Sequence, residues 1–264
     1  MKRPEFTFED LIHPLTDEAF QSTVKSKKPL VIRGSSFKNN FFGDITSWGD
    51  ISKYVSNDRA VAGLQMIQPD GSKLCMEKDN LHRKNKPGWT RDDWYEKAFV
   101  SDIWRNGGSM ILTKASMFSP NISAIASCLE QRYENSNADA HFYCSPKRSA
   151  VSFECHADQD DNFLVHAIGS VHWKVYNVHA RSEKDAEGRK RFTSRMTMTA
   201  EEEQKHEPII DTILKTGDLL YIPAGMFHKA VPDSARVSIS VPLAEMSSAR
   251  SIDRDYYDFT KNIS

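Results

Sequence analysis

Apolar and polar residues alternate in short runs along the second half of the chain, from about residue 140 to residue 243. Runs rich in β-branched and aromatic residues, separated by turn residues, predict the antiparallel strands of a β-barrel or a β-sandwich. The predicted strands are HFYCS (141–145), SAVSFECHAD (149–158), NFLVHAI (162–168), VHWKVYNV (171–178), PIIDTIL (208–214), DLLYIPA (218–224) and RVSISVPL (236–243).

The first half, residues 1–139, mixes helical and strand-like periodicity. Apolar spacing and start signals predict helices over residues 16–25, 48–55, 89–104 and 122–133. Apolar runs predict strands at KPLVIRG (28–34) and AVAGLQMIQ (60–68), and residues 78–86 are expected to form a polar loop. We therefore expect a single domain, in which a mixed α/β N-terminal region packs against the β-rich half.

Two segments do not follow the strand pattern. Residues 180–207 are nearly all polar or charged, which favours a solvated insertion. Alternatively, the basic residues of this insertion line a substrate entrance; they are Arg181, Arg189, Lys190, Arg191 and Arg195. Residues 244–264 are expected to form a tail or a short helix that packs on the barrel or supports a homodimer.

Composition narrows the class of protein. With 264 residues, of which 39% are hydrophobic, the chain can bury the core of a globular domain. Its formal net charge of −1 gives no broad attraction to nucleic acid or to an anionic membrane. The cysteines form no CxxC pair, the N-terminus has no apolar signal core, and no apolar run approaches about 20 residues. We therefore expect a cytoplasmic protein.

A histidine and an aspartate lie two positions apart at His156 and Asp158, inside a predicted strand. Because residues i and i+2 of a strand point to the same face, this imidazole and carboxylate can approach one point. The best third ligand is His228, which follows a turn, an apolar strand and a Pro-Ala-Gly corner. Two histidines and one carboxylate are the ligand set of non-haem Fe(II) oxygenases. The alternative is a surface histidine beside a turn aspartate.

The phrases HADQDDNFLVHAIGSVHWKVY (156–176) and GDLLYIPAGMFH (217–228) resemble the JmjC-type, cupin-fold Fe(II)/2-oxoglutarate oxygenases. This group includes the ribosomal oxygenases and the asparaginyl hydroxylase that acts on hypoxia-inducible factor. Weaker similarity extends the resemblance over residues 28–243. It implies a mainly β fold, a double-stranded β-helix or jelly-roll over residues 140–243, with His156, Asp158 and His228 as Fe(II) ligands. It also implies 2-oxoglutarate and O2 as cosubstrates.

One position departs from the family pattern. The family usually has Lys or Arg two residues before the tryptophan that corresponds to Trp173, where it binds the distal carboxylate of 2-oxoglutarate, and this chain has Val171. A replacement is Arg236, because Arg236-Val237-Ser238 resembles the Arg-x-Ser of prolyl hydroxylases and a guanidinium offers paired donors to a carboxylate. The alternative is that Arg236 forms a surface ion pair.

Other polar residues have weaker assignments. By the same resemblance, Asn162 is expected near the cosubstrate, and Trp173 packs the barrel. Tyr143, Arg148 and Lys174 are further candidates for the cosubstrate carboxylate. His166 and His172 are expected to be barrel histidines rather than ligands, and Cys155 should face away from His156. Asp160 and Asp161 are either substrate-facing groups or turn residues.

The resemblance implies a hydroxylase of a side chain in a protein or peptide, or a demethylase if the oxidised carbon is bonded to nitrogen. Two alternatives stay open: a hydroxylase of a free amino acid or small natural product, and a metal-binding cupin without 2-oxoglutarate turnover. The chain ends at Ser264 without the C-terminal winged-helix region of the ribosomal oxygenases, which argues against a ribosomal protein as substrate. Neither a membrane nor nucleic acid is expected as a partner.

Overall fold

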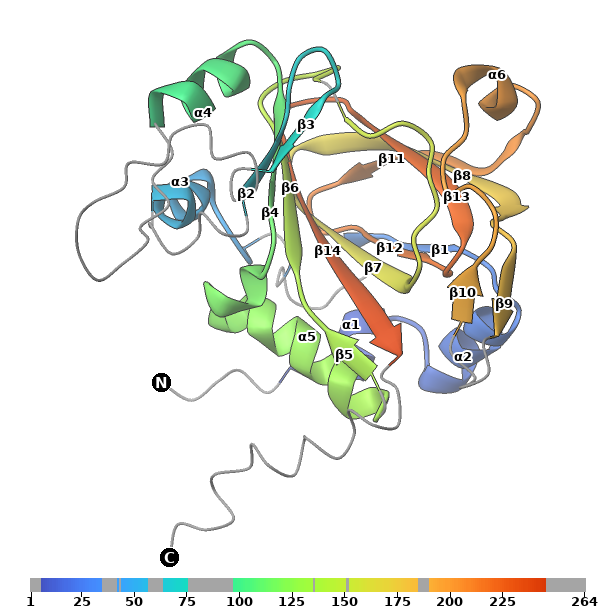
Figure 1. Ribbon diagram of the computed structural model, residues 1–264. Coiled ribbons are helices and arrows are strands. Elements are labelled where there is room, and N and C mark those ends of the chain that lie inside the picture. The colour runs from blue at the N-terminus through green and yellow to red at the C-terminus, as the bar shows by residue number, and fades with distance from the viewer. Residues whose placement is uncertain are drawn as a thin grey trace, which may run out of the picture.

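Two antiparallel sheets face each other across the β-rich half of the protein (Figure 1). The computed structural model describes residues 6–34, 42, 44–56, 64–75, 97–134, 136–150, 152–184 and 190–245. The larger sheet has the strand order β1-β12-β7-β14-β6-β4-β2-β3, with β5 paired to β14, and the smaller sheet has the order β11-β8-β13. This arrangement is the predicted jelly-roll.

The strands of the larger sheet are β1 (Leu30–Ile32), β2 (Leu64–Ile67), β3 (Lys73–Cys75), β4 (Ser109–Leu112), β5 (Ser136–Ala138), β6 (His141–Ser145), β7 (Asp161–Ile168), β12 (Leu219–Ile222) and β14 (Arg236–Glu245). The smaller sheet consists of β8 (Ser170–His179), β11 (Pro208–Lys215) and β13 (Met226–Pro232). A separate hairpin is formed by β9 (Ser182–Lys184) and β10 (Lys190–Phe192).

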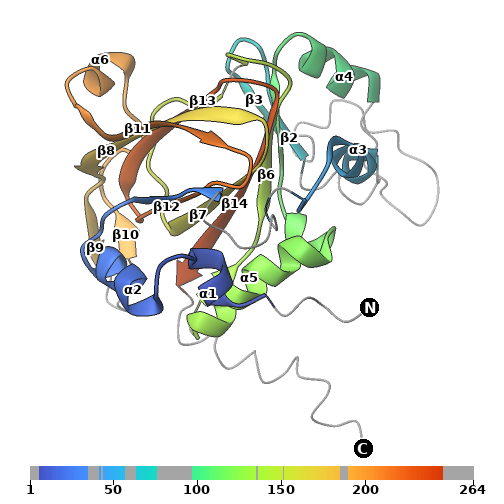
Figure 2. The same cartoon turned by 180° about the vertical axis from the view of Figure 1, so that it is seen from behind.

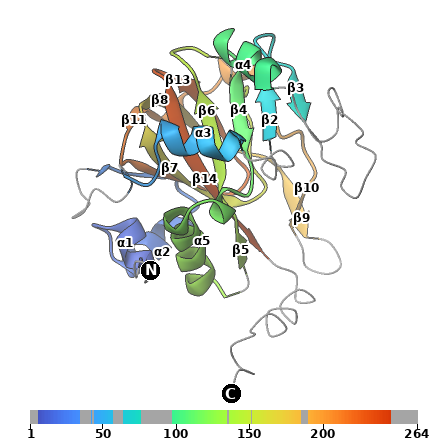
Figure 3. The same cartoon turned by 90° about the vertical axis from the view of Figure 1, so that its left-hand side faces the viewer.

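The helices of the described chain are α1 (Phe8–Ile12), α2 (Asp17–Lys25), α3 (Trp48–Ser56), α4 (Lys97–Arg105), the 3-10 helix η3 (Ala115–Met117), α5 (Pro120–Arg132) and α6 (Ala200–Glu203). The views of Figures 2 and 3 place α1, α2 and α5 together at one end of the larger sheet, and α1 contacts both of the others. In α2, the side chain of the N-cap residue Thr16 accepts a hydrogen bond from the backbone of Ala19.

The hydrophobic core has two main parts. The larger part lies between the helices and the larger sheet, where the ring of Phe20 packs on Phe163 and Tyr221 at centroid distances of 5.8 and 5.1 Å. The smaller part lies between the two sheets and contains Trp173 and the fully buried Val171. Trp173 therefore packs the barrel, as predicted. The space between the sheets around Val171 and Trp173 is filled by apolar side chains. A polar site inside the barrel must therefore lie outside this cluster.

Most of the predicted elements are confirmed with shifted ends, and one is wrong. The described residues of the segment 149–158 form no regular strand. Within it, His156 makes isolated bridges to Thr197 and to His228. Strand β13 and the short elements α1, β3, β4, η3 and β5 were not predicted. The polar insertion contains the β9–β10 hairpin and α6.

Some predictions fall partly or wholly outside the described residues. They concern the loop 78–86, residues 89–96 of a predicted helix, residues 60–63 of a predicted strand, and residues 246–264. The predicted homodimer stays a prediction, because it depends on that last segment. No helix in the described part of the chain is both long enough and apolar enough to span a membrane.

Candidate metal centre

His156, Asp158 and His228 lie together in the barrel. Each offers one ligand atom, and these atoms are all within 4.8 Å of one another. The Asp158 carboxylate oxygens lie 3.8 Å from Nε2 of His156 and 3.5 Å from Nε2 of His228. Ligand atoms on one face of a six-coordinate first-row metal are roughly 3 Å apart, since each bond is about 2.1 Å long. Small side-chain movements therefore suffice for all three to bind one ion.

Both imidazole rings are oriented by backbone carbonyls. Nδ1 of His156 lies 2.8 Å from the carbonyl oxygen of Glu154, and Nδ1 of His228 lies 2.9 Å from that of Met226. A carbonyl only accepts hydrogen bonds, so each Nδ1 carries the proton and donates it. Each Nε2 is then unprotonated, and its lone pair is directed toward Asp158. This is the tautomer that a metal site requires.

Local backbone pairing places the two histidines side by side. The backbone N–H of His156 donates to the carbonyl of His228 at 3.0 Å, and that of His228 donates to His156 at 2.7 Å. In an antiparallel pair, residues that exchange both bonds lie directly opposite each other with their side chains on the same face. The ring centroids are 4.5 Å apart. This pairing, rather than a regular strand through His156, positions the ligands.

His228 is buried, and this determines its charge. Desolvation lowers the pKa of His228 below its usual value, although the nearby Asp158 carboxylate partly opposes the effect. The indole of Trp173 packs 5.7 Å from the imidazole, between ring centroids. His228 is therefore neutral near pH 7, and a neutral imidazole is the form that binds a metal.

Asn162 contacts the metal-site carboxylate. Its Nδ2 donates to Oδ2 of Asp158 at 3.0 Å, and its Oδ1 accepts a hydrogen bond from the hydroxyl of Ser240 at 2.9 Å. The amide is thereby fixed in one orientation with its NH2 group on Asp158. Ser240 was not among the predicted site residues, although strand alternation from Arg236 through Ser238 indicated that it shares their face.

Arg236 is a buried cation without a carboxylate partner among the described residues. The residue is 3% exposed, its Nη1 donates to the hydroxyl of Ser238 at 2.9 Å, and its buried Nε has no partner. Burial lowers the pKa of Arg236 to about 10. The predicted alternative, a surface ion pair, is wrong because β14 turns this side chain into the barrel. A buried guanidinium without an acidic partner is suited to bind an anion.

One cavity connects this cation with the three candidate ligands. Its lining residues are Tyr143, Ser152, Phe153, His156, Asp158, Asn162, Leu164, Trp173, His228, Ala230, Arg236, Ser238 and Ser240. Tyr143, predicted as a further cosubstrate contact, is among them. Arg148 is not, because its side chain is 77% exposed and pairs with Asp233. Lys174 is also absent from the lining, because successive strand residues face opposite sides and its neighbour Trp173 points into the barrel.

The remaining singled-out residues have structural partners. Nδ1 of the buried His166 lies 3.0 Å from the Ser238 hydroxyl, and burial lowers the pKa of His166 to about 4. Cys155 is buried and faces away from the cavity, as predicted. Asp161 accepts hydrogen bonds from Tyr221 and from the backbone of Ala224, so it joins β7 to β12.

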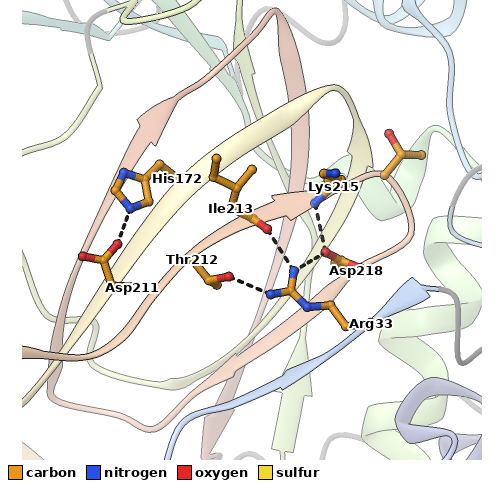
Figure 4. A pocket seen from close by; sticks show the side chains of 8 residues that line it. Arg33, His172, Asp211, Thr212, Ile213, Lys215 and Asp218 are labelled. Atoms are coloured by element: carbon orange, nitrogen blue, oxygen red, sulfur yellow. Dashed lines mark hydrogen bonds and ion pairs between the residues drawn. The ribbon is translucent and has the colours of Figure 1, made fainter.

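His172 lies on the outer face of the smaller sheet, where it pairs with Asp211 (Figure 4). It borders a separate open pocket in which Arg33 donates to Asp218 at 2.8 Å and to Thr212 at 2.6 Å. Both acidic residues of this pocket are already paired, Asp218 with Arg33 and Asp211 with His172. Among the insertion's arginines that the structure describes, Arg181, Arg191 and Arg195 do not line the metal-site cavity.

Comparison with known proteins identifies a family. The JmjC domain matches residues 112–251, which is more than half of the chain. Over 236 residues the chain is 27% identical to ribosomal oxygenase 1 of Danio rerio, an alignment that covers 89% of this chain and 40% of the relative. Over 241 residues it is 26% identical to the bifunctional lysine-specific demethylase and histidyl-hydroxylase NO66 of Branchiostoma floridae, covering 90% and 32%.

Solved structures show the same fold. The X-ray structure of E. coli ycfD matches with a TM-score of 0.58 and 18% identity, covering 94% of this chain and 59% of that one. The ribosomal oxygenase YcfD from Escherichia coli in complex with cobalt and 2-oxoglutarate matches with a TM-score of 0.55 and 18% identity, covering 92% and 56%. The chain spans less than half the length of the curated relatives from Danio rerio and Branchiostoma floridae. It is a member of the JmjC domain family.

Proposed function

We propose that this chain is an Fe(II)- and 2-oxoglutarate-dependent oxygenase that hydroxylates a side chain of a protein or peptide. One observation carries the proposal. A buried arginine without an acidic partner among the described residues shares a cavity with two histidines and one aspartate. A triad alone would fit several metal sites, but a triad beside an uncompensated cation fits a metal together with an anionic chelator.

The donor set fits Fe(II). His156 and His228 offer neutral imidazole nitrogens and Asp158 offers a carboxylate oxygen, which is the facial triad of non-haem iron oxygenases. When bound, Fe(II) with 2-oxoglutarate and O2 supplies the oxidation that hydroxylates a C–H bond and leaves succinate and CO2 as coproducts. The role of the chain is to hold the reactants in position and to exclude water.

The structure also fits 2-oxoglutarate. We assign its distal carboxylate to Arg236, whose Nε is buried without a partner, with Ser238 and Tyr143 beside it. A carboxylate there would provide the negative charge that balances the guanidinium and would accept charge-assisted hydrogen bonds from it. In this arrangement the cation that binds the carboxylate lies on β14 instead of β8, so Val171 can occupy the β8 position where the family usually has Lys or Arg. The dicarboxylate would then lie between the arginine and the metal.

Other cavity residues control orientation and solvent. Asn162 holds Asp158 by one oxygen, so the other oxygen stays free for the metal. The side chains of Phe153, Leu164 and Trp173 form apolar walls around the ligands. Apolar walls keep water from the reacting groups and strengthen the charge interactions within the site.

The substrate assignment rests on the relatives. Their names include a ribosomal oxygenase and a lysine-specific demethylase and histidyl-hydroxylase, which denote action on ribosomes and on amino-acid residues. We therefore favour a polypeptide side chain over a free amino acid. If the oxidised carbon is bonded to nitrogen, the same chemistry removes a methyl group.

Succinate formation from 2-oxoglutarate tests the proposal. The protein is loaded with Fe(II) in the absence of oxygen, mixed with 2-oxoglutarate and then exposed to air. The reaction is run without further addition, with a peptide mixture, or with free amino acids, and an Asp158→Ala variant is the control. We expect succinate that depends on iron and that peptides stimulate more strongly than amino acids. Stimulation by amino acids alone would move the substrate to small molecules. Absence of both succinate and 2-oxoglutarate binding in every condition would overturn the oxygenase.

A further inference from the structure

The segment that carries His156 and Asp158 is held from both sides. On one side it pairs with His228 of β13, as described above. On the other side, the N–H of Ala157 donates to the carbonyl of Met196 at 2.8 Å, and the N–H of Met198 donates to that of Cys155 at 2.9 Å. Met196 and Met198 belong to the polar insertion 180–207. The insertion thus supplies one of the two backbone partners of the metal-binding segment.

The beginning of the insertion reaches the same segment through Gly225. The N–H of Ala180 donates to the carbonyl of Gly225 at 2.7 Å, and the N–H of Gly225 donates to that of Asp158 at 2.8 Å. Gly225 has a φ of 82°, and a Cβ at this position would lie 2.7 Å from the ring of Phe192 in β10. The hairpin therefore packs directly on the corner that precedes His228.

The end of the insertion is anchored to the barrel by α6. Glu203, whose side chain is 13% exposed, accepts hydrogen bonds from the hydroxyl of Tyr176 on β8 and from Nζ of Lys229 on β13, both at 2.7 Å. Met198 is buried against Cys155 and Phe227 in an apolar cluster of its own. Figure 1 shows α6, β9 and β10 beside β8 and β13. Most described residues of the insertion are exposed, in agreement with the prediction of a solvated insertion, but Met198 and Glu203 also dock it on the barrel.

We propose that the described parts of the insertion, residues 180–184 and 190–207, form a clamp that holds His156 and Asp158 in their metal-binding positions and sets the affinity of the site. The part of this inference that concerns metal affinity rests on the proposed metal centre. The clamp and the ion order the same segment, so each favours the other. By linkage, a bound ion then makes opening of the clamp less favourable by the same free energy by which a closed clamp strengthens metal binding.

A pair of proline variants tests the clamp. Met198→Pro removes the N–H that donates to Cys155, and Met198→Leu keeps both that N–H and an apolar side chain. Thr197→Pro is the matched control, because the N–H of Thr197 donates no hydrogen bond within the described residues and its side chain is exposed. Tyr176→Phe removes one anchor of Glu203 and keeps every backbone bond. Thermal unfolding establishes that each variant folds.

Two readouts are taken on the full chain: affinity for Co²⁺ from its visible absorption, and hydrogen exchange of the Ala157 amide in metal-free protein. We expect Met198→Pro to weaken Co²⁺ binding by about 10- to 100-fold and to speed exchange of Ala157. Tyr176→Phe should shift both in the same direction by less, while Thr197→Pro and Met198→Leu should change neither. If Met198→Pro does not fold, Tyr176→Phe decides: wild-type exchange and affinity overturn the clamp.

The outcomes separate this inference from the proposed function. Equal Co²⁺ affinity in the wild type and in folded Met198→Pro overturns the clamp and leaves the metal centre intact. A wild type that binds no Co²⁺ overturns the metal centre and, with it, the affinity part of the inference. Hydrogen exchange in the metal-free chain still tests whether the insertion holds the segment. An unchanged exchange rate of the Ala157 amide in Met198→Pro would overturn this structural part of the inference too.

Discussion

Replacing Arg236 with methionine should separate cosubstrate binding from folding. Burial lowers the pKa of the guanidinium from 12.5 to about 10. A shift of one pKa unit corresponds to about 1.4 kcal/mol. Relative to the neutral form, the charged form is therefore roughly 3 kcal/mol less favourable in the folded chain than in water. The charge has no acidic partner in the described structure to offset this penalty. Methionine keeps an unbranched side chain as long as the arginine chain up to Nε and carries no charge.

The ligand-free Arg236→Met protein should therefore unfold at a temperature equal to or above that of the wild type. The guanidinium stays protonated in both the folded and the unfolded chain below about pH 10, so this difference should not change between about pH 6 and pH 8. Binding should respond in the opposite way. Loss of one partner of a buried charge pair costs about 2 to 5 kcal/mol, which lowers affinity for 2-oxoglutarate by roughly 30-fold to several thousand-fold.

Calorimetric titration of 2-oxoglutarate into metal-loaded protein gives the affinity, and unfolding curves with and without 2-oxoglutarate give the stability. The wild type should be stabilised by the ligand and the variant should not. Arg148→Met is the control, because this exposed arginine pairs with Asp233 outside the cavity. An unchanged affinity in Arg236→Met would refute the assignment. A ligand-free variant that is clearly less stable would show that the arginine serves the fold instead.

Three further predictions concern the surroundings of the site. Burial lowers the pKa of His166 from 6.5 to about 4, so its neutral form contributes stability above pH 6.5 that is lost as the pH falls toward 4. Between pH 7 and pH 5 the wild type should lose about 2 kcal/mol more unfolding free energy in urea than His166→Gln, and equal losses would contradict the shift. Asn162→Ala should weaken Co²⁺ binding by about 10- to 100-fold with little change in unfolding temperature, because Asp158 loses its orienting amide; wild-type affinity would show that the amide is dispensable. Gly225→Ala should lower the free energy of unfolding by at least about 1 kcal/mol, since the added methyl meets Phe192 at a positive φ, and a wild-type unfolding temperature would contradict that contact.

The sequence predicted the three candidate ligands because their spacing follows local rules. Residues two apart on an extended segment share a face, and the GDLLYIPAGMFH phrase marks where the chain returns to the barrel. Strand alternation also predicted that Arg236 and Ser238 lie on the same side of β14. Alternation cannot tell which side of a strand is the interior, so the buried and the surface positions of Arg236 could not be separated until the sheets were in place.

The predictions were wrong or incomplete where the structure depends on distant partners. The segment 149–158 has the composition of a strand, but its long-range backbone hydrogen bonds are divided among several partners rather than made to one continuous neighbouring strand. These partners are Met196, Met198, Gly225, His228 and Pro232. The insertion has a polar composition, yet a few buried groups, Met198 and Glu203 among them, dock it on the barrel. Composition averages over a segment and does not reveal such isolated anchors.

Addition of 2-oxoglutarate to the Fe(II)-loaded wild-type protein without oxygen tests the central claim most directly. A 2-oxoacid that chelates Fe(II) in a site with two histidines and one carboxylate produces a visible charge-transfer absorption. We predict a saturable absorption change that needs both iron and 2-oxoglutarate, disappears in Asp158→Ala and requires much higher 2-oxoglutarate concentrations in Arg236→Met. A wild-type protein that binds Fe(II) but shows neither this absorption nor any heat of 2-oxoglutarate binding would contradict the claim.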